Sequence, residues 1–380
     1  MSDSKDLDVY ARSLDLVLPQ QAPPLNGLKL ASFFCGCGGV DLGFRSAGFE
    51  LAFANDIYVR AAESFEANLG HAPVVGDIRE IDPTMQIPEV DVITGGFPCV
   101  TFSLAGKRMG IEDTLNGMLY QELCRMIQQR QPKYFVAENV KGMLLSRGGA
   151  DIKLILAAFL RMGYRTTYEL INMAEHGVPQ TRERVIFVGI RQDQWRGKFR
   201  FPAKTHRLRG DKKARGWLTP ALTLGDAIGD LPNVHGIVGM MHGDSAAKLK
   251  RGSSVGGFSN SKPRSINDTP HSQTTSPNVV MTNHDQVCRD NRSTFNSANR
   301  APNYALPGAS VVARSSSTQW ADNMRRMSVR ECARVQSFPD WFEFNGSMSD
   351  GYRQVGNAVP PLYALQLAKA LIEYDHREIR

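Results

Sequence analysis

The sequence predicts an α/β fold built on an open sheet with ligand sites at the ends of its strands. Short apolar runs alternate with helical patterns over the first 190 residues, and several runs end in glycines or carboxylates. Residues 28–34 form one such run, which leads into the glycine-rich loop 35–39 and then into a helical pattern from Val40. A strand, a glycine loop and a helix in this order begin a nucleotide-type α/β unit, in which the loop lets a ligand approach the backbone.

The composition is that of a globular protein. The chain has 380 residues, of which 42% are hydrophobic, enough for one large core and a smaller domain. No apolar run approaches membrane-spanning length, and the polar, acidic start does not resemble a signal peptide. The six cysteines show no paired zinc spacing, so we expect no metal and a reduced, cytoplasmic protein.

Positive charge is concentrated in one part of the chain. Residues 191–334 contain 23 Lys and Arg against 10 Asp and Glu, whereas the whole chain has a net charge of only +7. A charge run is usually a solvated face. A basic region in an otherwise acidic protein nevertheless favours a polyanionic partner, most simply nucleic acid.

Other elements follow from local patterns. Strands are expected at residues 49–54, 72–75, 91–94, 133–137, 164–173 and 184–190, and helices at 7–14, 40–47, 119–129 and 151–162. From about residue 192 to 320 the chain is rich in Ser, Asn, Gly, Pro and Arg, which predicts a loop-rich module with one short helix at 224–231. Helices are expected again at 328–336 and 362–373.

Three strand ends carry candidate functional residues. Asp56 and Asp77 end the second and third strands, where a carboxylate can hold the hydroxyls of a ribose, although each could instead be a helix cap or a turn residue. The fourth strand leads to Pro98 and Cys99. A lone cysteine is more often a buried structural residue, but its place in this series favours a nucleophile beside an adenosine-containing cofactor.

Six motifs, in this order, resemble those of the bacterial DNA cytosine-5 methyltransferase family over nearly the whole chain. They are Phe34-Cys-Gly36-Cys-Gly38-Gly39, Phe97-Pro98-Cys99, Glu138-Asn139-Val140, Gln180-Thr-Arg182-Glu-Arg184, Arg330-Glu-Cys-Ala-Arg334-Val-Gln336 and Gln354-Val-Gly356-Asn357. The resemblance implies a Rossmann-like methyltransferase sheet with helices on both faces and a smaller, loop-rich target-recognition domain. It implies a catalytic domain at 1–191, a target-recognition domain at 192–348 and a C-terminal segment at 349–380 that returns to the catalytic domain.

The resemblance also implies a set of site residues. The catalytic residues would be Cys99, Glu138, Arg182 and Arg184. S-adenosylmethionine would be held by Phe34, Gly36, Gly38, Gly39, Asp56, Ile57, Asp77, Ile78, Pro98 and Asn357. Double-stranded DNA would be contacted by Phe97, Ser103, Asn139, Val140, Arg207, Arg209, Lys212 and Lys213.

The implied reaction transfers a methyl group to carbon 5 of a cytosine. Because that carbon is a poor nucleophile, the Cys99 thiolate first adds to carbon 6. By resemblance, Glu138 holds the N3 side of the ring and Arg184 holds its carbonyl oxygen. The base must be rotated out of the duplex, and the loop 104–117 would close over it.

Two positions depart from the family pattern. Ser32 stands where an aspartate is usual before the cofactor loop, which leaves the amino end of the methionine to other partners. Val100 stands where a glutamine usually follows the nucleophile. Neither change removes a reacting group.

Two other functions use related sequences. A tRNA cytosine-5 methyltransferase shares the motifs, but the size and charge of the region 192–320 favour DNA. A catalytically silent DNA-binding regulator is disfavoured by the presence of Cys99, Glu138 and Arg184 together. The chain is expected to be a monomer without a membrane partner. We expect either the modification enzyme of a restriction-modification system, with a cognate endonuclease acting on the same site, or an orphan methyltransferase.

Overall fold

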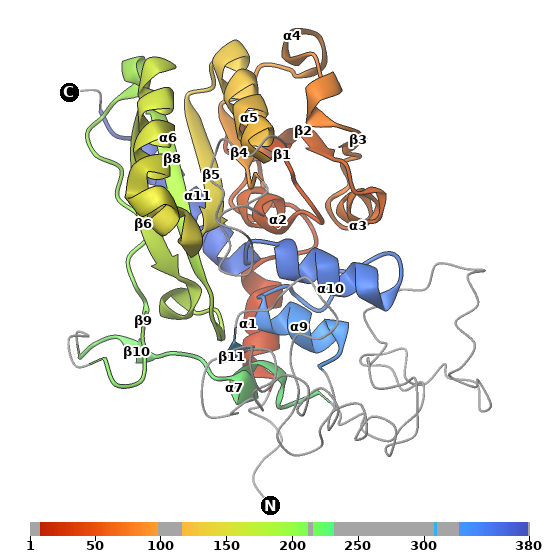
Figure 1. Ribbon diagram of the computed structural model, residues 1–380. Coiled ribbons are helices and arrows are strands. Elements are labelled where there is room, and N and C mark those ends of the chain that lie inside the picture. Colours follow the sequence, from red (N-terminus) through yellow and green to blue (C-terminus); the bar gives the residue numbers. More distant parts are fainter. Residues whose placement is uncertain (1–7, 98–115, 212–215, 232–307, 310–326, 379–380) are drawn as a thin grey trace, which may run out of the picture. The chain divides into compact units, whose positions relative to one another are not determined.

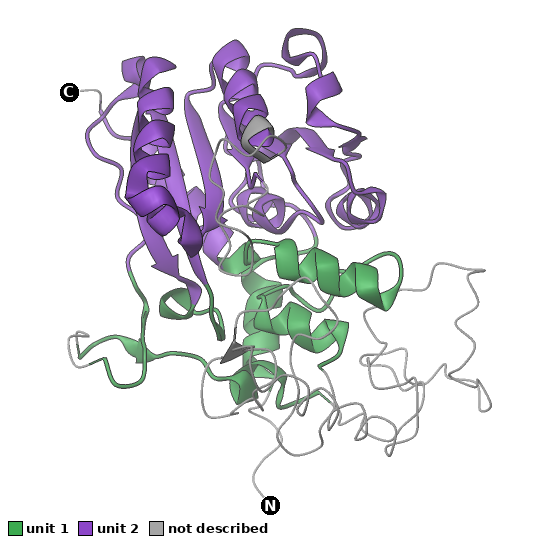
Figure 2. Cartoon of the chain, viewed as in Figure 1, with its two compact units in different colours: residues 1–20, 174–182, 204–362 green, residues 21–173, 183–203, 363–380 purple. Residues whose placement is uncertain are grey.

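A computed structural model describes residues 8–97, 116–211, 216–231, 308–309 and 327–378. The chain divides into two compact units, each made of several segments (Figure 2). Unit 2 comprises residues 21–173, 183–203 and 363–380, and unit 1 comprises residues 1–20, 174–182 and 204–362. These contact-based boundaries differ from the functional division expected at residues 192 and 349, which stays a prediction.

Unit 2 is built on a mixed sheet of seven strands (Figure 1). In spatial order they are β3 (Val74–Val75), β2 (Glu50–Asp56), β1 (Lys29–Phe33), β4 (Val92–Gly95), β5 (Tyr134–Val140), β8 (Glu183–Arg191) and β6 (Tyr164–Asn172). The strands from β3 to β5 are parallel, and β8 is antiparallel to both of its neighbours. The chain order reverses between β1 and β4, which is where open α/β sheets bind their ligands.

Helices cover both faces of this sheet. They are α2 (Gly39–Ser46), α3 (Val59–Leu69), α4 (Pro83–Gln86), α5 (Asn116–Arg130), α6 (Ala150–Arg161) and α11 (Pro361–Asp375), with 3-10 turns η1 (Ile78–Glu80), η2 (Lys141–Gly149) and η4 (Gln192–Gln194). Successive side chains of a strand point to opposite faces. In β5 both Tyr134 and Phe135 are fully buried, so neither face of the strand is open to water. This arrangement confirms the expected α/β fold.

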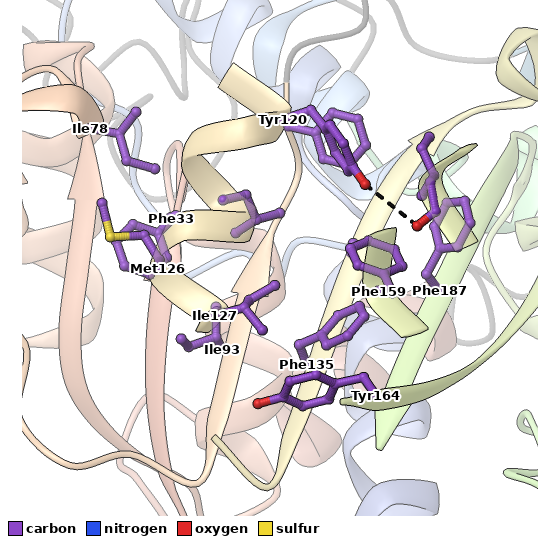
Figure 3. Packing of buried hydrophobic residues seen from close by; sticks show 14 of the residues in the cluster. Phe33, Ile78, Ile93, Tyr120, Met126, Ile127, Phe135, Phe159, Tyr164 and Phe187 are labelled. Atoms are coloured by element: carbon purple, nitrogen blue, oxygen red, sulfur yellow. Dashed lines mark hydrogen bonds between the residues drawn. The ribbon is translucent and has the colours of Figure 1, made fainter. Parts of the chain in front are cut away.

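An aromatic core joins the sheet to α5 and α6 (Figure 3). Phe135 of β5 lies 4.5 Å from Phe159 of α6 and 5.2 Å from Tyr164 of β6, measured between ring centroids. Phe159 in turn lies 6.0 Å from Tyr120 of α5. Gly189 of β8 is directly opposite Phe135 in the register, and its missing side chain leaves room for that ring.

The C-terminal helix α11 is fastened to the sheet by polar contacts. Tyr134 donates its hydroxyl to Asp375, at 2.6 Å, and receives a hydrogen bond from Arg196, at 2.9 Å. The Tyr374 hydroxyl accepts from the backbone N–H of Arg196 and donates to the carbonyl of Gly197. These hydrogen bonds link five residues inside a largely buried site.

In its described residues, unit 1 contains short helices and two-residue strands. Its elements are α1 (Val9–Val17), η3 (Met173–His176, which begins in unit 2), β7 (Gln180–Thr181), β9 (His206–Arg207), β10 (Thr219–Pro220), α7 (Leu224–Ile228), β11 (Gly308–Ala309), α9 (Val329–Val335) and α10 (Met348–Asn357). Buried Arg334 of α9 donates to Asp340, at 2.8 Å, and to Asp230, at 2.5 Å. These hydrogen bonds connect α9 to the segment that follows it and to the segment that follows α7. No helix in the described residues is long and apolar enough to cross a membrane.

The expected strands and most expected helices are present, with two corrections. No helix was expected at residues 351–357, but they belong to α10, which has a capping box at Ser347 and Asp350. The strand expected at 133–137, with Glu138 at its end, continues to Val140 because residues 138–140 pair with residues 184–186 of β8. The loop expected to close over the base lies almost entirely outside the described residues.

Substitution of Gly189 by Ala is expected to destabilise the protein. An added Cβ would lie 1.9 Å from Cε1 of Phe135, so the ring or the strand must shift, at a cost of about 3 kcal/mol. Gly76→Ala is the control, because a Cβ there meets no atom within 4 Å. Urea unfolding of both variants measures the difference, and equal stabilities would contradict this account of the core.

Candidate active site

The glycine loop after β1 has an unusual backbone. Phe34, Gly36 and Gly38 have φ values of 53°, 56° and 91°. At Gly38 an added Cβ would meet Leu69 at 2.6 Å, so only glycine fits at this start of α2. At Gly36 the same position is open, with no atom within 4 Å, and a ligand can approach the backbone there.

The Asp56 carboxylate is hydrogen-bonded to the backbone of this loop. One carboxylate oxygen accepts from the N–H of Gly36 and the other from the N–H of Tyr58, each at 2.7 Å. A carboxylate oxygen can accept more than one hydrogen bond, so a ribose hydroxyl can also donate to Asp56. Ile57, beside it, is 67% exposed and offers an apolar surface. The loop, the acid and the isoleucine therefore form a site of the kind that the sequence predicts for an adenosine group.

Asp77 has an additional local function. Its carboxylate accepts the backbone N–H of Arg79 and binds the Arg79 guanidinium, with a shortest distance of 2.5 Å. The hydrogen bonds from Arg79 lower the pKa of Asp77 to about 2. The cap expected as an alternative is thus present, and any cofactor contact has to share the carboxylate with Arg79. Ile78 is only 3% exposed and belongs to the core, so its side chain offers little surface to a ligand.

Glu138 and Arg184 form the centre of the candidate active site. The register places Arg184 of β8 opposite Val140 of β5, and the side chains of Arg184 and Glu138 meet at 2.7 Å. Both side chains are about one-sixth exposed, so the pair is sheltered but open to a ligand. The other Glu138 oxygen lies 3.3 Å from the Cβ position of Gly96, and a larger residue there would crowd it.

Asn139 fixes the backbone that leads toward Cys99. Its amide donates to the carbonyl of Phe97, at 3.4 Å, and its side-chain oxygen accepts from the N–H of Val140, at 2.8 Å. The Phe97 ring is 3% exposed and packs 5.3 Å from the Tyr120 ring. Because both side chains are buried, the structure gives Phe97 and Asn139 positioning roles, and DNA contacts from them stay a prediction. Pro98, Cys99, Val100 and Ser103 lie outside the described residues.

Arg182 is 1% exposed and binds backbone carbonyls in unit 1. Its Nη2 donates to Gly356, at 2.9 Å, and to Ala358, at 3.0 Å. Gln336 donates to the carbonyls of Val355 and Ala358, at 3.1 and 2.6 Å. The two side chains supply the donors that the last carbonyls of α10 lack, and the positive charge of Arg182 is favourable at a helix C-terminus.

This clamp, formed by Arg182 and Gln336, joins three of the six motifs. Gln180 donates to the carbonyl of Val335 and to the Gln336 side chain, so the arginine element, the end of α9 and the end of α10 form one network. Asn357 is exposed at the end of α10, and the clamp fixes its backbone. The sequence analysis missed these positioning roles. A sign of them in the sequence is that no glycine stands between Asn357 and the helix-breaking Pro360 and Pro361, so a helix that ends there needs donors from elsewhere in the chain.

The basic region is described only in part. Arg207 and Arg209 are exposed, and Arg207 also donates to the carbonyl of Leu218, at 3.2 Å. Lys204 is paired with Glu175, at 2.6 Å. Trp217 is 68% exposed in the same segment, an unusual exposure for so large an aromatic side chain. Lys212 and Lys213 lie outside the described residues.

Comparison with known proteins identifies the family. Residues 28–373 match the model of the C-5 cytosine-specific DNA methylases. The chain belongs to this family. It is 37% identical to the Type II methyltransferase M.NgoFVII of Neisseria gonorrhoeae over 91% of this chain and 87% of that protein. It is 34% identical to M.FnuDI of Fusobacterium nucleatum, over 91% of this chain and 94% of the other.

The match covers the glycine loop, the Glu138–Arg184 pair and the clamp on α10, so the chain is a DNA (cytosine-5-)-methyltransferase that uses S-adenosylmethionine. The open approach at Gly36 and the exposed Ile57 beside Asp56 fit that cofactor. The expected family, reaction class and cofactor are thereby confirmed.

Solved structures share the fold. A protein described as a DNA modification methyltransferase of an E. coli prophage has a TM-score of 0.64 at 19% identity, covering 91% of this chain and 99% of that one. The DNMT2 protein of Spodoptera frugiperda has a TM-score of 0.53 at 20% identity, covering 91% of this chain and all of that one. At these identities the likeness concerns the fold.

Replacement of Arg182 by Met is expected to lower the free energy of unfolding by about 2–4 kcal/mol. The reason is that the carbonyls of Gly356 and Ala358 lose a buried donor. Arg209→Met is the control, because Arg209 is exposed, and a surface change of this kind alters stability by about 0.5 kcal/mol or less. Urea unfolding distinguishes the two. An unchanged stability of the Arg182 variant would contradict the clamp and favour a role confined to the reaction.

Proposed function

We propose that Cys99 is the nucleophile and that Glu138 and Arg184 hold the target cytosine. The observation that carries the proposal is the 2.7 Å ion pair between the end of β5 and the start of β8. The pair lies beside Gly96, which precedes Cys99 by three residues. The thiolate adds to carbon 6 of the ring, and the electron pair displaced from the double bond makes carbon 5 nucleophilic. Bound S-adenosylmethionine supplies the methyl group. Loss of the proton on carbon 5 then lets the Cys99 thiolate leave.

The ion pair suits this chemistry because it is preorganised. Arg184 and Glu138 already face each other. A cytosine can therefore accept a hydrogen bond from Arg184 at its carbonyl oxygen and bind Glu138 through a proton shared between the carboxylate and N3, without a change of backbone. The same contact keeps both charges compensated before the base arrives. A base inside a duplex cannot reach such a sheltered pair, so the proposal includes rotation of the cytosine out of the stack.

We also propose that the basic region reads DNA around the target. Its positive charge, the exposed Arg207 and Arg209 and the exposed Trp217 support this role.

The relatives suggest a biological setting. They are named Type II methyltransferases, so the chain is proposed to modify the site of a restriction-modification system or to act as an orphan enzyme. A cytoplasmic monomer with access to chromosomal DNA fits both settings.

A covalent adduct is expected when the target cytosine carries fluorine at carbon 5. Fluorine stands where the carbon 5 proton must leave before the enzyme is released. Wild-type protein should therefore remain attached to the DNA in a denaturing gel. Bisulfite sequencing of DNA from cells expressing the protein first identifies the site to synthesise. Cys99→Ala is expected to form no adduct.

Cys124→Ala is the matched control. This half-buried thiol lies on α5, burial raises its pKa to about 11, and its loss should leave trapping intact. Adduct formation by the Cys99 variant, or its loss from the Cys124 variant alone, would contradict the assignment.

Neutralising the basic segment is expected to weaken DNA binding and its dependence on salt. If Arg207 and Arg209 contact phosphates, the double Ala variant should reduce the slope of log K against log salt concentration by about 2. Arg60→Ala is the control, since Arg60 is an exposed arginine paired with Glu63 on α3. Fluorescence anisotropy at several salt concentrations measures the slope. An unchanged slope would mean that the segment is only a solvated face.

A further inference from the structure

Asp41 is a buried carboxylate beside the cofactor loop. It lies in the first turn of α2, directly after the glycine loop, and is 0% exposed. Neither of its oxygens has a hydrogen bond of normal geometry, although the Ser32 hydroxyl next to it has a weak stabilising effect on its charge. Ser32 itself accepts a hydrogen bond from Thr94, at 3.1 Å, between neighbouring strands.

No positive side chain compensates Asp41 in the described part of the chain. Burial raises its pKa to about 7, and only Ser32 and the backbone of α2 oppose this rise. Arg45 lies one turn further along α2 and is also buried, but it is not among the groups that shift the pKa of Asp41. The other titratable groups nearby are the Cys35 and Cys37 thiols and the Asp56 carboxyl. Asp41 raises the pKa values of Cys35 and Cys37, and Asp56 acts on the same two thiols. The loop 35–38 therefore runs between two carboxylates and lacks a cation of its own.

Each of the other two buried carboxyl groups in the described residues has an ion-pair or hydrogen-bond partner. Asp151, also 0% exposed and also in the first turn of a helix, is paired with Arg147 at 2.8 Å and bonded to Ser146. Glu331 accepts the N–H of Ser328, at 2.6 Å, in the capping box of α9. Asp41 resembles them in burial and differs in lacking a partner, and a buried charge without a partner is costly.

We propose that the positive charge of S-adenosylmethionine compensates Asp41, which thereby favours the cationic cofactor over its neutral product. The methionyl end carries a sulfonium and an ammonium group, and the backbone of the loop beside Asp41 is open to a ligand at Gly36. The carboxylate is enclosed, so it acts on the ligand through the electric field in a medium of low dielectric. The negative charge of Asp41 would also replace that of the aspartate that is usual in the family at the position of Ser32.

This assignment gives the buried acid a role in turnover. S-adenosylmethionine has one more positive charge than the S-adenosylhomocysteine that remains after methyl transfer. An ionised Asp41 therefore binds the substrate form of the cofactor more tightly than the product form, and the product leaves more easily. The inference rests on the cofactor lying at the glycine loop, as proposed for Gly36 and Asp56.

The test compares three ligands on Asp41→Asn by calorimetry at pH 7.5. We expect about tenfold weaker binding of S-adenosylmethionine, a smaller loss for S-adenosylhomocysteine and no change for 5′-methylthioadenosine, which lacks the amino-acid end. Asp151→Asn is the matched control and should leave all three affinities unchanged. Equal losses for the three ligands, or none, would overturn the proposal. If the wild-type protein bound none of the three ligands, the result would instead count against the glycine loop as the cofactor site.

The variant is expected to fold. A carboxyl group whose pKa rises on folding gives stability below its ordinary pKa near 4, and this stability is lost as the pH rises through about 7. Asparagine carries no charge, so Asp41→Asn should be at least as stable as the wild type at pH 8.

A measurement on the wild type gives a second test. Between pH 5.5 and 7 the α-amino group of the ligand stays charged, so the change in affinity reports on the protein. Binding of S-adenosylmethionine should strengthen several-fold over this range while binding of 5′-methylthioadenosine stays constant. A flat profile for S-adenosylmethionine would overturn the proposal independently of any variant.

Discussion

The sheet of unit 2 is covered by helices on both faces, and this constraint decides where polar groups can act. A strand whose two faces are buried can expose a polar side chain only near its ends. Asp56 lies at the end of β2, and Glu138 lies two residues before the end of β5. The glycine loop begins where β1 ends. The functional residues therefore gather at one edge of the sheet because the remainder of each strand is occupied by the core.

The antiparallel strand β8 provides what parallel strands alone could not. It runs back along β5, so its first residues lie beside the last residues of β5. Arg184, near the start of β8, can therefore meet Glu138, near the end of β5. In a parallel arrangement the start of β8 would lie at the opposite edge, a full strand length away. The direction of this one strand thus creates the ion pair on which the proposed recognition of cytosine depends.

Much of this could be predicted from the sequence, for local reasons. Strands and helices follow from apolar periodicity, and the glycine loop follows from residues that tolerate positive φ. The direction of β8 and the Glu138–Arg184 contact depend on pairing between distant segments, which periodicity does not encode. Helix α10 was missed because Gly351 and Gly356 weaken its pattern, and because its C-terminus is stabilised by Arg182 and Gln336 from elsewhere in the chain.

Several buried charged side chains obtain a partner when the chain folds, whereas Asp41 is proposed to obtain one when a ligand binds. Arg334 has its aspartates, Arg182 has its carbonyls and Asp151 has its arginine, and each pairing holds chain segments together. Folding alone therefore satisfies them. Asp41 has no such partner among the described residues, and its burial is costly unless something else compensates the charge. A cationic cofactor at the neighbouring loop is such a compensation, and it converts an unfavourable feature of the free enzyme into preference for the methyl donor.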